Sequence, residues 1–128
     1  LLELGAGFHP DMSGRENIYT NASIFGLTRK EINERIDDII AFSELEEFID
    51  NPVRTYSSGM YMRLAFSVAI NVDADILLFD EITSALDEKT SYEIFQTLIK
   101  LKKTHTILMI SHKPSEYQQC DQIINLSF

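Results

Sequence analysis

The protein has 128 residues, of which 45% are hydrophobic, so one domain can bury a core without disulfide bonds or structural metals. Its formal net charge of -9 disfavours nucleic acid as a partner, because such binding depends on Lys and Arg side chains that neutralise phosphates. The single cysteine, Cys120, cannot form an internal disulfide, which favours a reducing cytoplasm, and no apolar run approaches the roughly 20 residues of a membrane-spanning helix.

Two helix-start signals stand in the first half of the sequence. Ser13 and Thr28 are each followed three residues later by a glutamate, which is the pattern of a capping box. The first signal predicts a helix that ends at Gly26, and the second predicts a helix over residues 29–43. Apolar residues recur at helical spacing in both segments and are expected to face a core: Ile18, Ala22, Ile24, Phe25, Ile32, Ile36, Ile39, Ile40 and Phe42.

A loop rich in small hydroxyl residues leads into the next predicted helix. Residues 55–60 are Thr-Tyr-Ser-Ser-Gly-Met, and they precede an apolar helical stretch over residues 64–70. The first amides of a helix lack partners inside it, and the positive end of the helix dipole lies behind them. Ser57, Ser58 and Gly59 are therefore expected to form an anion site at the start of this helix.

The second half of the sequence predicts a parallel α/β unit. The apolar run 76–79 has the length of a buried strand, a helix is expected over residues 88–102, and a second strand is expected over residues 106–110. This order is that of a βαβ crossover. A further helix is expected over residues 114–120 and a further strand over residues 122–126. The long helix is expected to turn these residues inward: Tyr92, Phe95, Leu98 and Ile99.

Asp80, Glu81 and His112 follow the two predicted strands. Ligands of open α/β sheets bind beyond the carboxyl ends of the strands, where these side chains are expected to meet. Asp80 could hold a magnesium ion while Glu81 orients and deprotonates a water, and the His112 imidazole could hydrogen-bond a phosphate oxygen or that water. Taken singly, the acidic pair also fits a solubilising loop, and a lone histidine is more often structural.

Four segments together resemble, in order and spacing, the motifs of ABC ATPases. Residues 76–81 resemble the Walker B motif, residues 84–87 resemble the D-loop, and His112 falls at the switch histidine. Residues 56–60 resemble the signature motif. The resemblance implies an α/β P-loop NTPase fold in incomplete form, a helical subdomain followed by part of the parallel-sheet core.

The resemblance also implies a division of the chain. Residues 1–55 are similar to the Q-loop region and the α-helical subdomain, and residues 56–128 are similar to the signature helix with the Walker B, D-loop and switch-histidine part of the core. Residues 2–10, 13–19 and 56–60 are together similar to ATPases that export O-antigen, capsule or teichoic acid chains, whereas residues 83–87 look more like ABC exporters in general. The resemblance therefore implies an ATP-binding and ATP-hydrolysing subunit of a transporter that exports a polysaccharide or lipopolysaccharide.

Roles at a site for ATP and Mg²⁺ follow from the same resemblance. Asp80 would hold the metal ion, Glu81 would be the catalytic base, and His112 would be the switch histidine of the same subunit. His9 lies where most ABC proteins have the Q-loop glutamine, and it is expected at the nucleotide site on that ground.

The resemblance implies partners as well. In the family, two ATPase subunits sandwich two ATP molecules, so Ser57, Ser58 and Gly59 would face the nucleotide bound by a second copy, and Asp87 would contact that copy. A transmembrane permease subunit would be the other partner, at the cytoplasmic face of the cell membrane. The helical part around residues 9–21 is expected either to contact the permease as a lever or to form a packed cap.

One family motif does not occur in the sequence. The 128 residues contain no Gly-x-x-x-x-Gly-Lys-Ser/Thr stretch, the loop that cradles nucleotide phosphates. We therefore expect the chain to bind ATP poorly by itself and to be the C-terminal part of a longer domain. A truncated, non-catalytic module that docks on a partner, or a gene remnant, is the alternative. An ABC-type ATPase that works on DNA is disfavoured by the acidic charge.

Overall fold

The computed structural model describes residues 4–126 except 82 and 84–85, and it divides into two compact units. The helical unit is Leu1–Ala74, and the α/β unit is Asp75–Phe128. The functional division at residues 55 and 56, which the family resemblance implies, stays a prediction.

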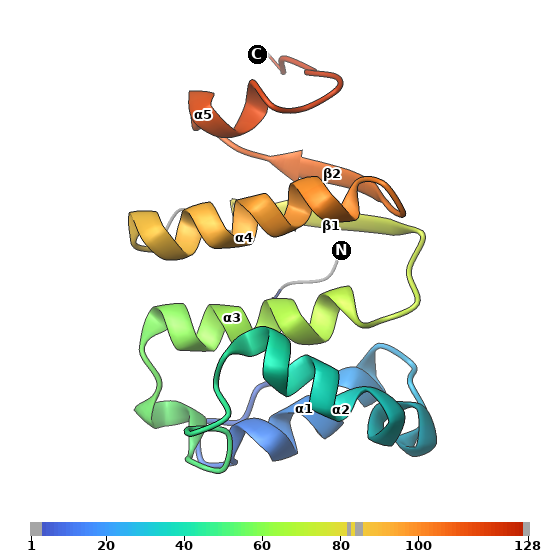
Figure 1. Ribbon diagram of the computed structural model, residues 1–128, viewed down its shortest axis with the longest axis vertical. Helices are drawn as coiled ribbons and strands as arrows, with labels where there is room; N and C mark the ends of the chain where they lie inside the picture. Colours follow the sequence, from blue (N-terminus) through green and yellow to red (C-terminus); the bar gives the residue numbers. More distant parts are fainter. Residues whose placement is uncertain (1–3, 82, 84–85, 127–128) are drawn as a thin grey trace. The chain divides into compact units, whose positions relative to one another are not determined.

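The helical unit contains the helices α1 (Gly14–Ile24), α2 (Arg29–Ser43) and α3 (Ser58–Ile70), with the short 3-10 helix η1 at Val53–Thr55 (Figure 1). Both predicted capping boxes are confirmed, because the Ser13 and Thr28 side chains each accept a hydrogen bond from the backbone of the glutamate three residues on. Each of these glutamates in turn accepts a hydrogen bond from the backbone of its cap residue. The two helices therefore begin where local sequence places their caps.

A single apolar cluster holds the helical unit together. Its fully buried members come from all three helices and include Ile18, Ile32, Ile39, Leu64 and Val68. Removal of this apolar surface from water is the main favourable contribution to the folding of the unit.

Two of the side chains that were expected in this core are exposed instead. Ile24 is 62% exposed, because it is the last residue of α1 and projects away from the buried stripe. Phe42 is 41% exposed, and its ring lies at the edge of the core with its centroid 6.1 Å from that of Phe66. The prediction of an inward position was wrong for both.

The α/β unit contains β1 (Ile76–Asp80), α4 (Glu88–Leu101), β2 (Thr106–Ile110) and α5 (Pro114–Tyr117). The strands pair in parallel, with Ile76 opposite Thr106 and Asp80 opposite Ile110. Strand, helix and strand follow one another as a βαβ crossover, as the sequence predicted (Figure 1).

The burial of the α/β unit differs from the prediction at two positions. Along β1, Leu77 and Phe79 are buried but Ile76 is 65% exposed, so one face of this strand is covered within the described part of the chain. Tyr92 is 65% exposed, because it lies about 100° around the helix from Ser91, on the side away from the buried residues Thr90, Ile94 and Leu98.

The end of the chain also differs from the prediction. The helix expected over residues 114–120 is a single turn, Pro114–Tyr117. The strand expected over residues 122–126 is absent, and Ile123, Ile124 and Leu126 are exposed. An apolar run forms a strand only where a neighbouring strand offers hydrogen-bond partners, and no described segment pairs with these residues. Among the described residues, no helix is both long and apolar enough to cross a membrane.

Candidate active site

Glu81 and His112 are in contact at one edge of the α/β unit. The parallel pairing of β1 and β2 puts their carboxyl ends side by side, and the backbone N–H of Glu81 continues the ladder by donating to the carbonyl of Ile110 at 3.0 Å. His112 Nε2 lies 2.9 Å from Glu81 Oε1. The structure therefore brings the two expected catalytic side chains together by strand register.

The backbone at Glu81 adopts an uncommon conformation. Its φ angle is 44°, in the left-handed region that residues other than glycine rarely adopt. Conformations of this kind cost roughly 1–3 kcal/mol and recur at functional sites. The Glu81 side chain is 44% exposed and the His112 side chain is 86% exposed, so this edge is open to a ligand from solvent.

Asp80 ends β1 immediately before Glu81 and is exposed. The described residues contain no group of three or more His, Cys, Asp and Glu side chains that could hold a metal ion. Magnesium, however, is commonly held by one or two carboxylates together with phosphates of the substrate. Asp80 can therefore supply one carboxylate ligand but not a complete protein-built metal site.

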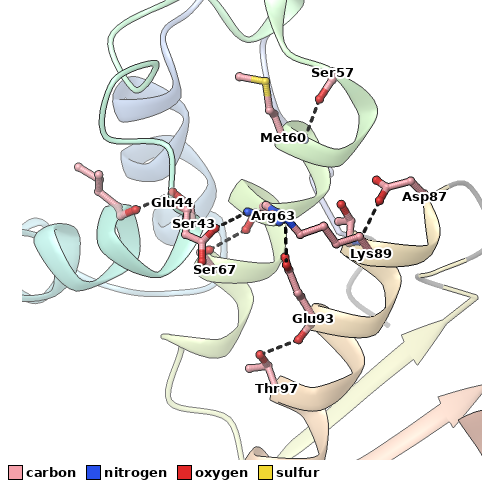
Figure 2. A network of polar contacts seen from close by, with 12 residues as sticks. Ser43, Glu44, Ser57, Met60, Arg63, Ser67, Asp87, Lys89, Glu93 and Thr97 are labelled. Carbon is pink, nitrogen blue, oxygen red and sulfur yellow. Dashed lines mark hydrogen bonds and ion pairs between the residues drawn. The ribbon is translucent and has the colours of Figure 1, made fainter.

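Asp87 begins α4 and serves as its N-cap. Its carboxylate accepts a hydrogen bond from the backbone N–H of Thr90 at 2.9 Å, and this bond lowers the pKa of Asp87 below its ordinary value (Figure 2). Ser84 and Ala85, the first residues of the expected D-loop, lie outside the described residues. Asp87 is thus an exposed, negatively charged side chain at the start of a helix.

Ser57, Ser58 and Gly59 form the start of α3 in the helical unit. Ser57 is the N-cap, and its hydroxyl accepts from the backbone N–H of Met60 at 3.2 Å, as Figure 2 shows. Ser58 and Gly59 are the first two residues of the 13-residue helix. Backbone amides at this position lack partners inside the helix and favour an anion. The predicted anion site thus has the expected secondary structure.

His9 lies in an exposed loop of the helical unit that a buried asparagine holds in place. Asn17 is fully buried, and its side-chain oxygen accepts from the backbone N–H of His9 at 2.7 Å. Its side-chain nitrogen lies 3.0 Å from the His9 carbonyl, 3.2 Å from that of Met12 and 2.9 Å from that of Ser13. The structure thus fixes the backbone of His9, while its imidazole accepts only a local bond from the N–H of Asp11 at 3.3 Å.

Sequence reasoning missed Asn17 and a polar cluster in the α/β unit. The cluster joins the buried residues Thr83 and Glu116 to the partly exposed Ser111 and Lys113. Ser111 and Lys113 flank His112 in sequence, and Thr83 lies two residues after Glu81. A glutamate two residues after a proline looks like an ordinary exposed helix residue, so the sequence carries no signal for the burial of Glu116. Asn17 did offer one signal, because asparagine favours caps and turns and this one lies inside a predicted helix.

Comparison with known proteins identifies related sequences. The family model described as ABC transporter matches residues 3–84. The O-antigen export system ATP-binding protein RfbB of Myxococcus xanthus is 56% identical over 123 residues, which is 94% of this chain and 28% of that protein. RfbB of Klebsiella pneumoniae is 50% identical over 126 residues, which is 97% of this chain and 51% of that protein.

A more distant relative is the teichoic acids export ATP-binding protein TagH of Enterococcus faecalis. It is 41% identical over 125 residues, which is 96% of this chain and 28% of that protein. The chain thus spans between about a quarter and a half of the length of these curated relatives.

The fold matches solved structures of ATP-binding cassettes. The dimeric post-hydrolysis structure of the cassette MJ0796 bound to ADP and Pi superposes with a TM-score of 0.72 and 26% identity, covering 92% of this chain and 53% of that one. The predicted fold class, an incomplete P-loop NTPase fold of the ABC ATPase type, is thereby confirmed. Because the family model covers residues 3–84, which is more than half of the 128, the chain belongs to the ABC transporter family.

Proposed function

We propose that the chain is part of the ATP-binding and ATP-hydrolysing subunit of an ABC transporter that exports a polysaccharide or lipopolysaccharide. The observation that carries the proposal is the 2.9 Å contact between Glu81 and His112 at the carboxyl ends of two parallel strands. The choice of exported substrate is supported by the names of the relatives, which are O-antigen and teichoic acid export proteins.

Glu81 is the catalytic base in this proposal. Its carboxylate orients a water molecule and accepts a proton from it as the water attacks the terminal phosphate of ATP. The His112 imidazole contacts the carboxylate through Oε1 and would contact the same phosphate or water. In this proposal the contact with His112 orients Glu81, and the carboxylate acts once a water lies within hydrogen-bond distance of it.

Asp80 fits the role of a magnesium ligand, because its exposed carboxylate ends β1 one residue before the base. When bound, a magnesium ion supplies positive charge that neutralises the phosphates. His9 is proposed as a nucleotide-binding residue, in the sequence position of the Q-loop residue.

Ser57, Ser58 and Gly59 are proposed to bind the phosphates of an ATP held by a second copy of the subunit. The N-terminus of a helix of this length offers backbone amides and a positive dipole end to an anion. Approach of two copies would exclude water from the phosphates and place these amides opposite the base. Asp87 is proposed to contact that second copy.

The subunit is further proposed to work at the cytoplasmic face of the cell membrane with a transmembrane permease subunit. The cassette MJ0796, to which the chain is similar in fold, has been solved as a dimer, which supports a paired arrangement.

Export is tested in the native cells with the complete gene. Removal of the gene is expected to leave labelled glycan inside the cells, and the wild-type gene is expected to restore its appearance at the surface. A gene with Glu81→Gln should fail to restore it, whereas Asp121→Asn should restore it, because that change breaks only an exposed ion pair with Lys102. Normal surface glycan with Glu81→Gln would overturn the proposed function.

A further inference from the structure

Glu116 is buried although it lies on a one-turn helix. It is 6% exposed, and each oxygen of its carboxylate accepts a hydrogen bond from a hydroxyl. The Thr83 hydroxyl donates to Oε1, and the Ser111 hydroxyl donates to Oε2 at 2.5 Å. A helix of four residues has little stability of its own. These bonds therefore fix α5 to the segments that follow β1 and β2.

Lys113 completes the cluster. Its ammonium donates to the carbonyl of Thr83 at 2.8 Å and to the Thr83 hydroxyl at 3.0 Å, and it lies 3.8 Å from Glu116 Oε1. The backbone N–H of Lys113 donates to the Ser111 hydroxyl at 3.0 Å, so that hydroxyl has its own proton available for Glu116. The Ser91 hydroxyl in α4 also donates to the Thr83 carbonyl, at 3.3 Å.

A buried carboxylate imposes one arrangement on its neighbours. Taking such a group out of water is costly unless hydrogen bonds and an opposite charge compensate it. Glu116 has both, from two hydroxyls and the nearby Lys113 ammonium. A shift of any partner leaves part of that compensation unmade, so the cluster resists distortion.

The cluster joins the two segments that carry the Glu81 and His112 pair. Ser111 and Lys113 are the residues on either side of His112, and Thr83 lies two residues after Glu81. Both segments are therefore held by the same carboxylate, that of Glu116.

We propose that Glu116 is a positioning residue, which holds His112 in register with Glu81 by fixing Ser111 and Thr83. The inference rests on the proposed ATP hydrolysis and deepens it. Replacement of Glu116 by Gln keeps the shape of the side chain but puts an amide group where one of the two hydroxyls now finds an acceptor. One of the two bonds that tie Thr83 and Ser111 to residue 116 is then lost.

The test uses the complete protein and measures the kcat and KM of ATP hydrolysis. Glu116→Gln is expected to lower kcat about tenfold or more, since small misplacements of catalytic groups cost up to about a hundredfold, and to leave KM within about twofold. Asp121→Asn is the charge-matched control in the same unit and should leave both constants unchanged. A folded Glu116→Gln variant with a kcat within about twofold of wild type would overturn the inference.

A double-mutant cycle separates positioning from a merely structural role. If Glu116 acts through His112, then adding Glu116→Gln to a His112→Ala variant should lower its residual kcat less than about twofold, measured with labelled ATP. An equal loss in both backgrounds contradicts the inference. If Glu116→Gln does not fold, Thr83→Val removes one hydroxyl with little change of shape and enters the same cycle with the same two outcomes.

The outcomes also distinguish this inference from the proposed function. A complete wild-type protein that turns over no ATP would defeat the proposed function and the inference with it. An active wild-type protein in which the two substitutions combine independently would defeat the inference alone.

Discussion

Asn17 offers a quantitative test of how the helical unit holds the loop that carries His9. Asn17 is fully buried, and its side chain hydrogen-bonds to backbone groups of this loop, at His9, Met12 and Ser13. The side-chain nitrogen has two hydrogens for three carbonyl oxygens, so the side chain makes at most three hydrogen bonds at once, one accepted and two donated.

Replacement of Asn17 by Ala should destabilise the protein by about 3 kcal/mol, because each of these bonds contributes about 1 kcal/mol net. The three carbonyls keep other donors, namely the backbone N–H groups of Met12, Val53 and Asn17 itself, so their loss is limited. Replacement by Asp should cost at least as much as Ala, since a carboxylate offers no hydrogen to the carbonyl oxygens around it.

Urea unfolding followed by circular dichroism measures the free energy of unfolding of both variants. Their midpoints can be compared with that of wild type when the m-values are equal. Asn33→Ala is the matched control in the same unit, because Asn33 is exposed and only accepts a bond from the Tyr19 hydroxyl. The control should lose less than about 1 kcal/mol. A loss below about 1 kcal/mol for Asn17→Ala would show that these bonds do not hold the loop.

Two further predictions concern the packing and the charges of the helical unit. Gly14→Ala should destabilise the protein by about 1–3 kcal/mol in the same assay, because the added methyl would collide with the Tyr56 hydroxyl. Adding Tyr56→Phe to this variant should recover part of the lost stability. An unchanged stability of Gly14→Ala would contradict the close packing at this position. The hydrogen bond from Arg35 lowers the pKa of Asp73 below its ordinary value of 3.8, so the stabilising effect of this pair is present above that pH and is lost as the pH falls through the lower folded value. The difference in urea midpoint between wild type and Asp73→Asn should therefore be constant from about pH 7 to about pH 5 and should shrink below about pH 4. A difference that grows on acidification would contradict a lowered pKa of Asp73 in the folded protein.

The features that sequence predicted well are those with local causes. The starts of α1 and α2 depend on hydroxyl and glutamate pairs three residues apart, and both capping boxes formed. The meeting of Glu81 and His112 was predictable from one topological rule, since consecutive strands of a βαβ unit are parallel and end at the same edge.

The features that sequence did not predict depend on several distant segments at once. The burial of Glu116 needs hydroxyls from Thr83 and Ser111 together, and no periodic pattern reports such a meeting. The failed strand at residues 122–126 shows a related limit, because an apolar run fixes strand propensity but not the presence of a pairing edge. Short apolar runs and single carboxylates are therefore the least predictable parts of this chain.

ATP binding and turnover by the complete protein with Glu81→Gln test whether Glu81 is the catalytic base. Loss of the base should reduce turnover by about a hundredfold or more while nucleotide affinity stays close to wild type, because the base acts in the chemical step. Affinity is measured with a fluorescent ATP analogue, and turnover is measured by phosphate release. We expect the variant to retain its affinity for the nucleotide and to lose turnover. Sustained hydrolysis by the variant would show that Glu81 is not the base.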